Sequence, residues 1–410
     1  MVKQQLKQIQ NLTILHNNNN EIDSKLQNYL KNIYDKLDFN KNNYLNILRE
    51  IYIDNKIHEF RYDHNLCIIN VNVNINNSSY EIINKSSLPK DSRIKIIKNF
   101  FKTFITWIKH NNIHKNIIIN TCILIWISDR FIWSKDPHSN PDKELPICLY
   151  ACPKNLNYII IPDNTFFVLN TTKRYGHIGL NWISQKKLYD KQIRYTKKNK
   201  IFFRGADTTD LNHNLRRFIY DKLHTETDKE FKNCMIYEFL TKANYESVEK
   251  TGIYKFQLNL PGRYPWSTRL KYLYLSKSFI INVRVKTIGD LDKPDDIYKS
   301  FVDLFIDDKL MINIDMNYKY YDYKFHNSYE EYKKYDIYNK NECEKVYNKI
   351  KSIWKKYKND NPNDNPNVIK ANKLINNLDD NNIYNYYLHI LLNNQKIGMK
   401  PITKEILTTF

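Results

Sequence analysis

The chain has 410 residues and a net charge of +20, and 42% of its residues are apolar and 14% aromatic. This apolar content can fill the cores of one large or two ordinary domains, which excludes a disordered chain despite the asparagine runs. Glycine and proline are rare, with seven and twelve residues, while Asn, Lys, Ile and Tyr are common. We attribute this composition to an AT-rich genome, and we expect codon bias to account for part of the positive charge.

We predict neither a signal peptide nor a membrane span. The first residues lack the apolar core of a signal peptide, and the most apolar run, 117–127, is too short to cross a bilayer and contains Asn120. The six cysteines are scattered, and only Cys148 and Cys152 are close, without a second pair that would complete a zinc site. We therefore expect free core thiols and a cytoplasmic protein without a transmembrane segment.

The first part of the chain predicts a mixture of helices and strands. Apolar residues recur at helical spacing over 21–53, and the alternation over 56–84 predicts a hairpin that turns near Asn76–Ser79. An amphipathic helix over 90–109 precedes a buried strand over 117–127. Short strands are expected at Ile147–Tyr150 and Tyr158–Ile161. We interpret residues 1–195 as an N-terminal α/β domain.

Residues 196–365 predict a second α/β domain. The strand Ile201–Phe203 ends at Arg204 and Gly205, and a helix with Arg216 and Arg217 follows a polar loop. A second strand, YKFQLNL, ends in a Pro-Gly-Arg loop, and Ser267 is the expected N-cap of the next helix. The pattern continues with the strand SFIINV and with a helix over 341–357.

The asparagine- and proline-rich stretch NDNPNDNPN at 359–367 is predicted to be a linker. Residues 368–394 have a helical pattern, and we expect 366–410 to form helices that pack back on the N-terminal domain. The fold class is therefore α/β, with two Rossmann-like domains, a cleft between them and helical termini.

Both strand–loop–helix units of the second domain place glycine and arginine where a strand ends. Nucleotide phosphates bind at such carboxyl edges, where glycine permits close approach and arginine can bind two phosphate oxygens. Each residue also has an ordinary structural interpretation. Arg204 could form a salt bridge with a carboxylate, and Arg216 and Arg217 could lie on a solvated helix face.

Two motifs of this domain resemble glycosyltransferase family 90, which includes the protein O-glucosyltransferases and the capsule-associated xylosyltransferases. The first is FFRGADTT, and the second is YKFQLNLPGRYPWSTRLKYLYLSKSFIINV. Residues that match the second motif of the family are Tyr254, Lys255, Asn259, Gly262, Ser267 and Arg269. Weaker similarity in ILIWISDRF and in PICLYACPKNLNYIIIPDNTFF extends the resemblance over roughly residues 115–310.

The resemblance implies a GT-B fold and transfer of a sugar, glucose or xylose, from a UDP-sugar to a hydroxyl of a protein or glycan. It implies inversion at the anomeric carbon, with the UDP-sugar as co-substrate and no metal or other cofactor. Asp129 takes the position of the catalytic base, and Asp163 is the reserve candidate. The implied donor-binding residues are Arg204, Gly205, Thr208, Arg217, Gly262, Arg263, Trp266, Ser267 and Arg269.

The sequence departs from the family pattern at two positions. Asp129 is followed by Arg-Phe rather than Tyr-Pro, and Asp207 stands where a basic residue is frequent. Asp129 could instead pair with Arg130 or cap a turn, and Trp266 could pack in the core rather than stack on uracil. Asp290-Leu291-Asp292 matches a metal-binding D-x-D, but its polar surroundings favour a solvated loop.

Two other functions stay open. A charge of +20 with interleaved aromatics would suit a nucleic-acid-binding protein. Against this, the lysines are spread along the chain among acidic residues. The third possibility is an inactive relative that acts as a binding module. The chain lacks the P-loop and dinucleotide-binding glycine motifs. Because the composition of the chain is AT-rich, we expect it to be an enzyme of a protist or of a large DNA virus.

Overall fold

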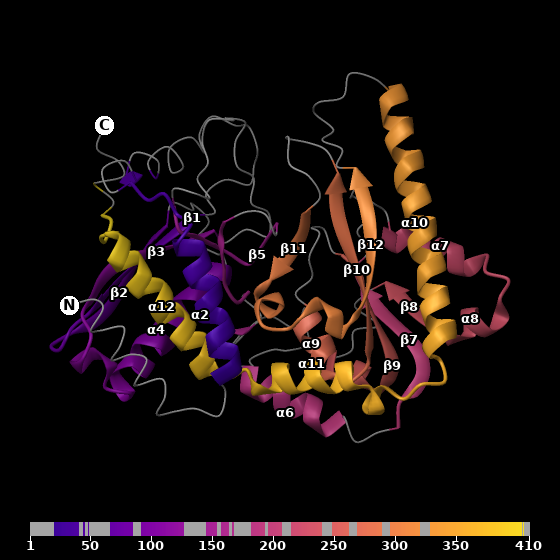
Figure 1. Ribbon diagram of the computed structural model, residues 1–410, viewed down its shortest axis with the longest axis horizontal. Helices are drawn as coiled ribbons and strands as arrows, with labels where there is room; N and C mark the ends of the chain where they lie inside the picture. Colours follow the sequence, from indigo (N-terminus) through magenta and orange to yellow (C-terminus); the bar gives the residue numbers. More distant parts are fainter. Residues whose placement is uncertain are drawn as a thin grey trace. The chain divides into compact units, whose positions relative to one another are not determined.

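The computed structural model describes residues 20–40, 44–45, 48, 66–84, 92–126, 145–153, 157–163, 166–167, 182–192, 196–206, 215–239, 248–261, 269–288, 296–319, 329–403 and 405. The chain divides into two compact units (Figure 1). The first comprises the described residues up to Cys152, those within Leu156–Val168 and those from Asn377 onward. The second comprises those within Pro153–Asn155 and Leu169–Asn376.

A mixed sheet forms the centre of the first unit. Strands β1 (Leu66–Val73) and β2 (Ser78–Asn84) form an antiparallel hairpin, and β1 also pairs antiparallel with β3 (Ile119–Trp126). Strands β4 (Ile147–Leu149) and β6 (Ile159–Ile160) extend the sheet in parallel. The predicted hairpin is confirmed, but it turns slightly earlier, because the side chain of Asn74 accepts hydrogen bonds from the backbone N–H groups of Asn76 and Asn77 (2.9 and 2.8 Å).

Three helices of this unit are α2 (Asn20–Tyr34), α4 (Ser92–His110) and α12 (Asp380–Ile397). Helix α12 begins with a capping box at Asp379 and ends at Gly398, whose φ of 100° is the left-handed conformation that glycine adopts at low cost. Asn394 joins α12 to the other elements. Its Nδ2 donates to the Cys122 carbonyl of β3 (2.9 Å), and its Oδ1 accepts from the Tyr34 hydroxyl of α2 (2.6 Å).

The second unit is built on parallel strands in the order β8-β7-β9-β10-β12. The strands are β7 (Lys198–Gly205), β8 (Met235–Phe239), β9 (Tyr254–Asn259), β10 (Phe279–Ile288) and β12 (Ile312–Lys319). The short antiparallel β11 (Asp296–Ser300) pairs with the end of β10. When the five parallel strands are numbered along the chain, their arrangement across the sheet is 2-1-3-4-5. This is a doubly wound arrangement, which is compatible with a Rossmann-like fold.

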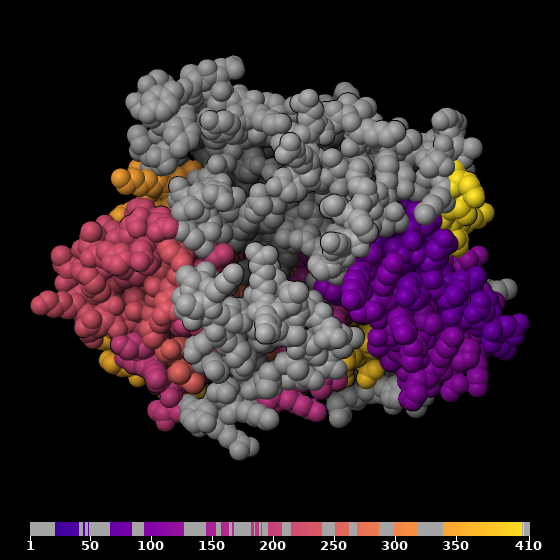
Figure 2. All heavy atoms as spheres, turned by 180° about the vertical axis from the view of Figure 1, so that it is seen from behind, coloured from indigo at the N-terminus to yellow at the C-terminus, as the bar shows by residue number. Residues whose placement is uncertain are grey.

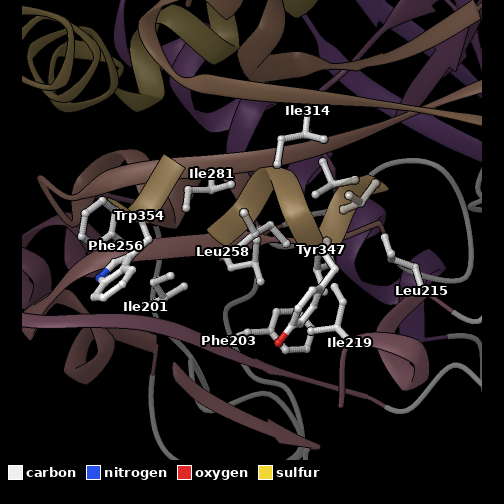
Figure 3. Close-up of a cluster of buried hydrophobic side chains, with 14 of the residues drawn as sticks. Ile201, Phe203, Leu215, Ile219, Phe256, Leu258, Ile281, Ile314, Tyr347 and Trp354 are labelled. Atoms are coloured by element: carbon white, nitrogen blue, oxygen red, sulfur yellow. The ribbon is translucent and has the colours of Figure 1, made fainter. Parts of the chain in front are cut away.

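One face of this sheet is the apolar core of the second unit. Alternate residues of the strands pack there against α7 (Leu215–His224) and α10 (Tyr329–Tyr357), and Figure 1 shows α10 lying along the sheet. Figure 3 shows Phe203 and Ile201 of β7, Phe256 and Leu258 of β9, and Tyr347 and Trp354 of α10 within this cluster. The strands and helices predicted for 201–203, 254–260, 278–283 and 341–357 are thereby confirmed.

The remaining described elements are shorter and lie mostly in the second unit. Helix α8 (Lys229–Cys234) follows α7, and Figure 2 shows this part of the chain in pink on the surface. The others are η2 (Ile113–Lys115), β5 (Ala151–Pro153), α6 (Trp182–Gln192), η4 (Val248–Ile253), α9 (Leu270–Leu275), η5 (Phe301–Leu304), η6 (Asp308–Leu310), η7 (Pro362–Asp364) and α11 (Pro366–Asn377).

The limits of the two units differ from the predicted domain limits. Residues before 196 were assigned to the first domain, but α6 belongs to the second unit, where Trp182 packs on Tyr272 of α9 with ring centroids 6.2 Å apart. Helix α11 also belongs to the second unit up to Asn376, because Asn372 Nδ2 donates to the last carbonyls of α9 (3.0 and 3.1 Å). Of the predicted C-terminal helices, α12 belongs to the first unit.

The stretch 359–367 is not the linker that its composition indicated. Its side chains cap turns and a helix, since Asn361 caps η7 and Asn365 accepts hydrogen bonds from the first N–H groups of α11 (3.0 and 3.2 Å). Pro362 is buried, and Pro366 is the first residue of α11. Asparagine and proline are as common in caps and first helical turns as in linkers, so composition alone cannot distinguish them.

A half-buried lysine joins the amino ends of the central strands of the second unit. The Lys197 amine donates to the carbonyl oxygens of Gly252 and Ser276 and to the Ser278 hydroxyl (3.1 Å for the last). Burial, and secondarily the charge of Lys277, lowers the Lys197 pKa to about 7. Lys197 therefore ties the start of β7 to the segments that precede β9 and β10.

We expect Lys277→Gly to raise the free energy of unfolding by about 1 kcal/mol. Lys277 follows the C-cap of α9 with φ 50°, a left-handed conformation in which a Cβ costs energy and glycine does not. Urea denaturation of the wild type, Lys277→Gly and Lys277→Ala measures this. The alanine variant retains the Cβ and isolates the effect of the charge near Lys197. If the glycine variant were no more stable than the alanine variant, the left-handed conformation at Lys277 would not cost the folded protein free energy.

All six cysteines are buried free thiols, as predicted. Burial raises the pKa of the Cys122 thiol to about 12, so its reactive thiolate is suppressed. In the described part of the chain, none of the helices combines the length and apolar content needed to cross a membrane.

Candidate functional site

The two sequence motifs lie at the carboxyl ends of neighbouring strands. The first follows β7, the second follows β9, and these strands pair in parallel. After β7 the chain forms β8, which pairs with β7 on the side away from β9. After β9 it forms β10, which pairs with β9 on the side away from β7. The point between β7 and β9 is therefore the topological switch point of the sheet, where ligands bind in doubly wound folds.

Two arginine side chains meet at this point around the buried Phe203 ring. Arg269 lies at the start of α9, and Arg216 lies in the first turn of α7. Their guanidinium carbons are 4.9 and 5.4 Å from the centre of the Phe203 ring. Arg269 Nη1 donates to the Arg204 carbonyl at the end of β7 (2.5 Å).

Arg216 holds the ends of both strands. It is 6% exposed, and its Nη1 and Nη2 donate to the carbonyls of Ala206 after β7 and Leu260 after β9 (2.7 and 3.3 Å). Burial and then the charge of Arg216 lower the pKa of Arg269 from its usual value. Two cations thus share a poorly solvated place, which is electrostatically favourable for an anion.

Gly205 provides the space that this arrangement needs. A Cβ at this position would lie 2.9 Å from Cζ of Phe203 and 3.2 Å from Nη1 of Arg216. Both distances are too short for ordinary packing, so a side chain would displace the ring or the guanidinium. The sequence predicted that Gly205 lets a phosphate approach the backbone, and donor binding stays a prediction, whereas the atoms that a Cβ would meet belong to Phe203 and Arg216 of the chain itself.

Gly205→Ala is expected to lower the free energy of unfolding by about 1–3 kcal/mol, because the core around Phe203 must shift. The matched control is Gly252→Ala, whose Cβ would meet its nearest atom, Cβ of Ser276, at 3.9 Å. Chemical denaturation of both variants makes the comparison. Equal stability of the two variants would show that the close contacts at Gly205 relax without cost.

Arg204 and Arg217 have other partners than the predicted phosphate. Nε and Nη2 of Arg204 donate to Oε2 of Glu238 on β8 (2.8 and 2.6 Å), which is the salt bridge that the sequence left open. Arg217 lies over the rings of Phe239 and Tyr220, at 4.6 and 5.6 Å. Of the two neighbouring arginines on α7, Arg216 is therefore the one at the switch point.

The other predicted site residues fall outside the described residues. They are the candidate base Asp129 and the donor-site residues Thr208, Gly262, Arg263, Trp266 and Ser267. The helix predicted from Ser267 begins at Leu270, with Arg269 as its N-cap, and has six residues. So short a helix has a weak dipole, and the arginine side chains carry the positive charge of the site. The reserve base Asp163 is buried in the first unit.

A row of polar side chains crosses the sheet on the face opposite the apolar core. Backbone register pairs Arg204 with Glu238, Asn259 with Asn282, and Asn282 with Asn313. Phe202 pairs with Gln257, so Asn259 lies at the level of Arg204. The row therefore includes a residue from each of the parallel strands at the end where the two motifs meet.

Sequence reasoning did not assign Arg216 and Asn259 to the site. Arg216 was weighed both as an arginine near a phosphate-binding strand end and as part of a solvated helix face, without a choice between them, and Asn259 only as a match to a motif. A signal for Arg216 was present, because it lies in the first turn of a helix that follows a strand end and a glycine. Comparison with protein-family models finds no matching family, and comparison with curated proteins finds no matching sequence.

Proposed function

We propose that this protein is a GT-B-like glycosyltransferase that moves a sugar, glucose or xylose, from a UDP-sugar to a hydroxyl of a protein or glycan. In this proposal the second unit binds the donor and the first contributes the acceptor side. The observation that carries the proposal is the pair Arg216 and Arg269 at the switch point between β7 and β9. A diphosphate is the part of a UDP-sugar that two cations at a strand end would bind.

The chemistry needs positive charge where the leaving group departs. The acceptor oxygen attacks the anomeric carbon, a base takes the hydroxyl proton, and UDP leaves with the bonding electron pair. Arg269 and Arg216 can stabilise the charge that grows on the β-phosphate, in a place where burial strengthens electrostatic interactions. Asp129 remains the proposed base. Attack from the side opposite UDP accounts for the proposed inversion and needs no metal.

The test is calorimetric binding of UDP, UDP-glucose and UDP-xylose to the wild-type protein in EDTA. We expect UDP to bind without a divalent metal and one UDP-sugar to bind best, which would identify the donor. Titration of a single-stranded and a duplex oligonucleotide under the same conditions tests the nucleic-acid alternative. Failure of every nucleotide to bind would overturn the transferase proposal.

A second measurement separates an enzyme from an inactive binding module. The preferred UDP-sugar is incubated with protein extracts and glycans as acceptors, and released UDP is measured. Release that depends on the acceptor and is lost in Asp129→Asn would support transfer with Asp129 as base. Tight UDP binding without release in any mixture would instead favour the binding module.

A further inference from the structure

The side-chain amides of the polar row form a directed chain of hydrogen bonds. Asn259 Nδ2 donates to Asn282 Oδ1 (2.7 Å), and Asn282 Nδ2 donates to Asn313 Oδ1 (3.0 Å). Asn313 Nδ2 donates to the backbone carbonyl of Asp308 (2.6 Å). The chain thus runs from β9 across β10 to β12 and ends on a main-chain acceptor.

That main-chain end fixes the orientation of every amide. A carbonyl oxygen accepts only, so the Asn313 group that faces Asp308 is its NH₂. Its oxygen then faces Asn282, which must present its own NH₂, and the same logic extends to Asn259. Turning Asn259 around would place its NH₂ group away from Asn282 and set two oxygens against each other. The Oδ1 of Asn259 is therefore held on the side that faces away from Asn282 and from the other amides of the hydrogen-bonded row.

Within the part of the chain that the structure describes, this oxygen is a hydrogen-bond acceptor without a donor. Asn259 is 5% exposed, and among the described residues no donor makes a hydrogen bond to its Oδ1. Its neighbour in the row, Arg204, directs Nε and Nη2 to Glu238 on the far side. A buried acceptor without a donor costs free energy, and a functional role or a bound water or ion is among the explanations for such groups in proteins.

The position of the oxygen identifies the kind of ligand. Asn259 is the last residue of β9, one residue before the Leu260 carbonyl that Arg216 binds. The acceptor thus lies at the same strand end as the arginine pair, on the opposite face of the sheet. An anion bound by the arginines could extend past the strand end and place an attached hydroxyl group there.

We propose that Oδ1 of Asn259 accepts a hydrogen bond from a hydroxyl of the ligand, on the ribose or on the transferred sugar. This inference rests on the proposed function and assigns Asn259 as a specificity residue of the donor site. Its role is distinct from that of the arginines. They bind negative charge, whereas Asn259 distinguishes a hydroxyl-bearing ligand from a simple diphosphate.

Calorimetry of Asn259→Ala with UDP, UDP-glucose and inorganic pyrophosphate tests the inference. We expect UDP-glucose to bind about tenfold more weakly than to wild type, and pyrophosphate to bind equally well. An equal loss for UDP would assign the hydroxyl to ribose. A loss confined to UDP-glucose would assign it to the transferred sugar.

The matched control is Gln257→Ala, two residues earlier on the same strand and face. Gln257 is also a buried amide, and it donates to the Thr251 carbonyl away from the strand end. Both variants are expected to lower the melting temperature, and only Asn259→Ala should weaken sugar-nucleotide binding. If Asn259→Ala does not fold, Asn259→Ser takes its place, with an intermediate loss because the serine oxygen is an acceptor on a shorter side chain.

The failures of the two proposals are distinguishable. Wild-type affinity in Asn259→Ala, or equal losses in Asn259→Ala and Gln257→Ala, would overturn the hydroxyl contact while UDP binding by the wild type still supported the transferase. Loss of pyrophosphate binding in Asn259→Ala would also overturn it, since it would indicate general damage to the site. Failure of the wild type to bind UDP or UDP-glucose would overturn both.

Discussion

Replacing Arg269 with alanine is expected to weaken UDP binding by about 100-fold, because a hydrogen bond between a guanidinium and a phosphate oxygen contributes about 1.5–3 kcal/mol. Arg269 lies at the switch point, where Nη1 donates to the Arg204 carbonyl and the guanidinium packs over Phe203. Arg269→Lys should recover part of the affinity, since it retains the charge but loses the paired donors. Isothermal calorimetry with UDP in EDTA measures both variants.

The matched control for this experiment is Arg217→Ala. Arg217 lies near the same strand ends but packs over the rings of Phe239 and Tyr220. We expect its removal to change UDP affinity only a few-fold, in proportion to the loss of general positive potential. If Arg217→Ala weakened binding as strongly as Arg269→Ala, overall charge rather than the switch-point arrangement would account for binding.

Lys197→Met is expected to lower the free energy of unfolding by about 2–4 kcal/mol, because it leaves buried carbonyl groups without donors. The Lys197 amine donates to the carbonyls of Gly252 and Ser276 and to the Ser278 hydroxyl. Methionine retains the length and apolar contacts of the side chain but cannot donate. Urea denaturation measures the effect, and Lys198→Met, at an exposed neighbouring position, is the control.

The effect of Lys197→Met should also depend on pH. Burial lowers the Lys197 pKa to about 7 in the folded protein, against the usual lysine value of 10.5. Between these values the unfolded chain binds more protons, so Lys197 makes the wild type more stable as pH rises, and this contribution is lost as pH falls to about 7. The stability difference between wild type and variant should therefore grow from about pH 7 to about pH 10. A constant difference over this range would contradict the lowered pKa.

The local pattern of the sequence was sufficient to predict most elements of both units. Alternation predicted β1, β2 and β9, and helical spacing predicted α4 and α10, because burial of one face imposes these periods on the chain. The places where glycine and arginine follow a strand were also visible without the structure. Composition misled at 359–367, since the residues of a linker are also those of helix caps.

The choice between neighbouring residues depended on tertiary packing. Arg216 and Arg217 are adjacent in the sequence, but successive residues on a helix point about 100° apart. One therefore faces the strand ends and the other the rings of Phe239 and Tyr220. Arg204 and Gly205 differ likewise, because successive residues of a strand point to opposite faces.

The sequence by itself determined the α/β class, the buried free cysteines and the two motifs at strand ends, since each follows from local periodicity or residue chemistry. Only the tertiary structure decided that β7 lies beside β9, which brings Arg216 and Arg269 together, and that Asn259, Asn282 and Asn313 share one row. Strand order and register are set by packing between segments that are distant in the sequence. The local spacing of residues therefore does not reveal which strands become neighbours.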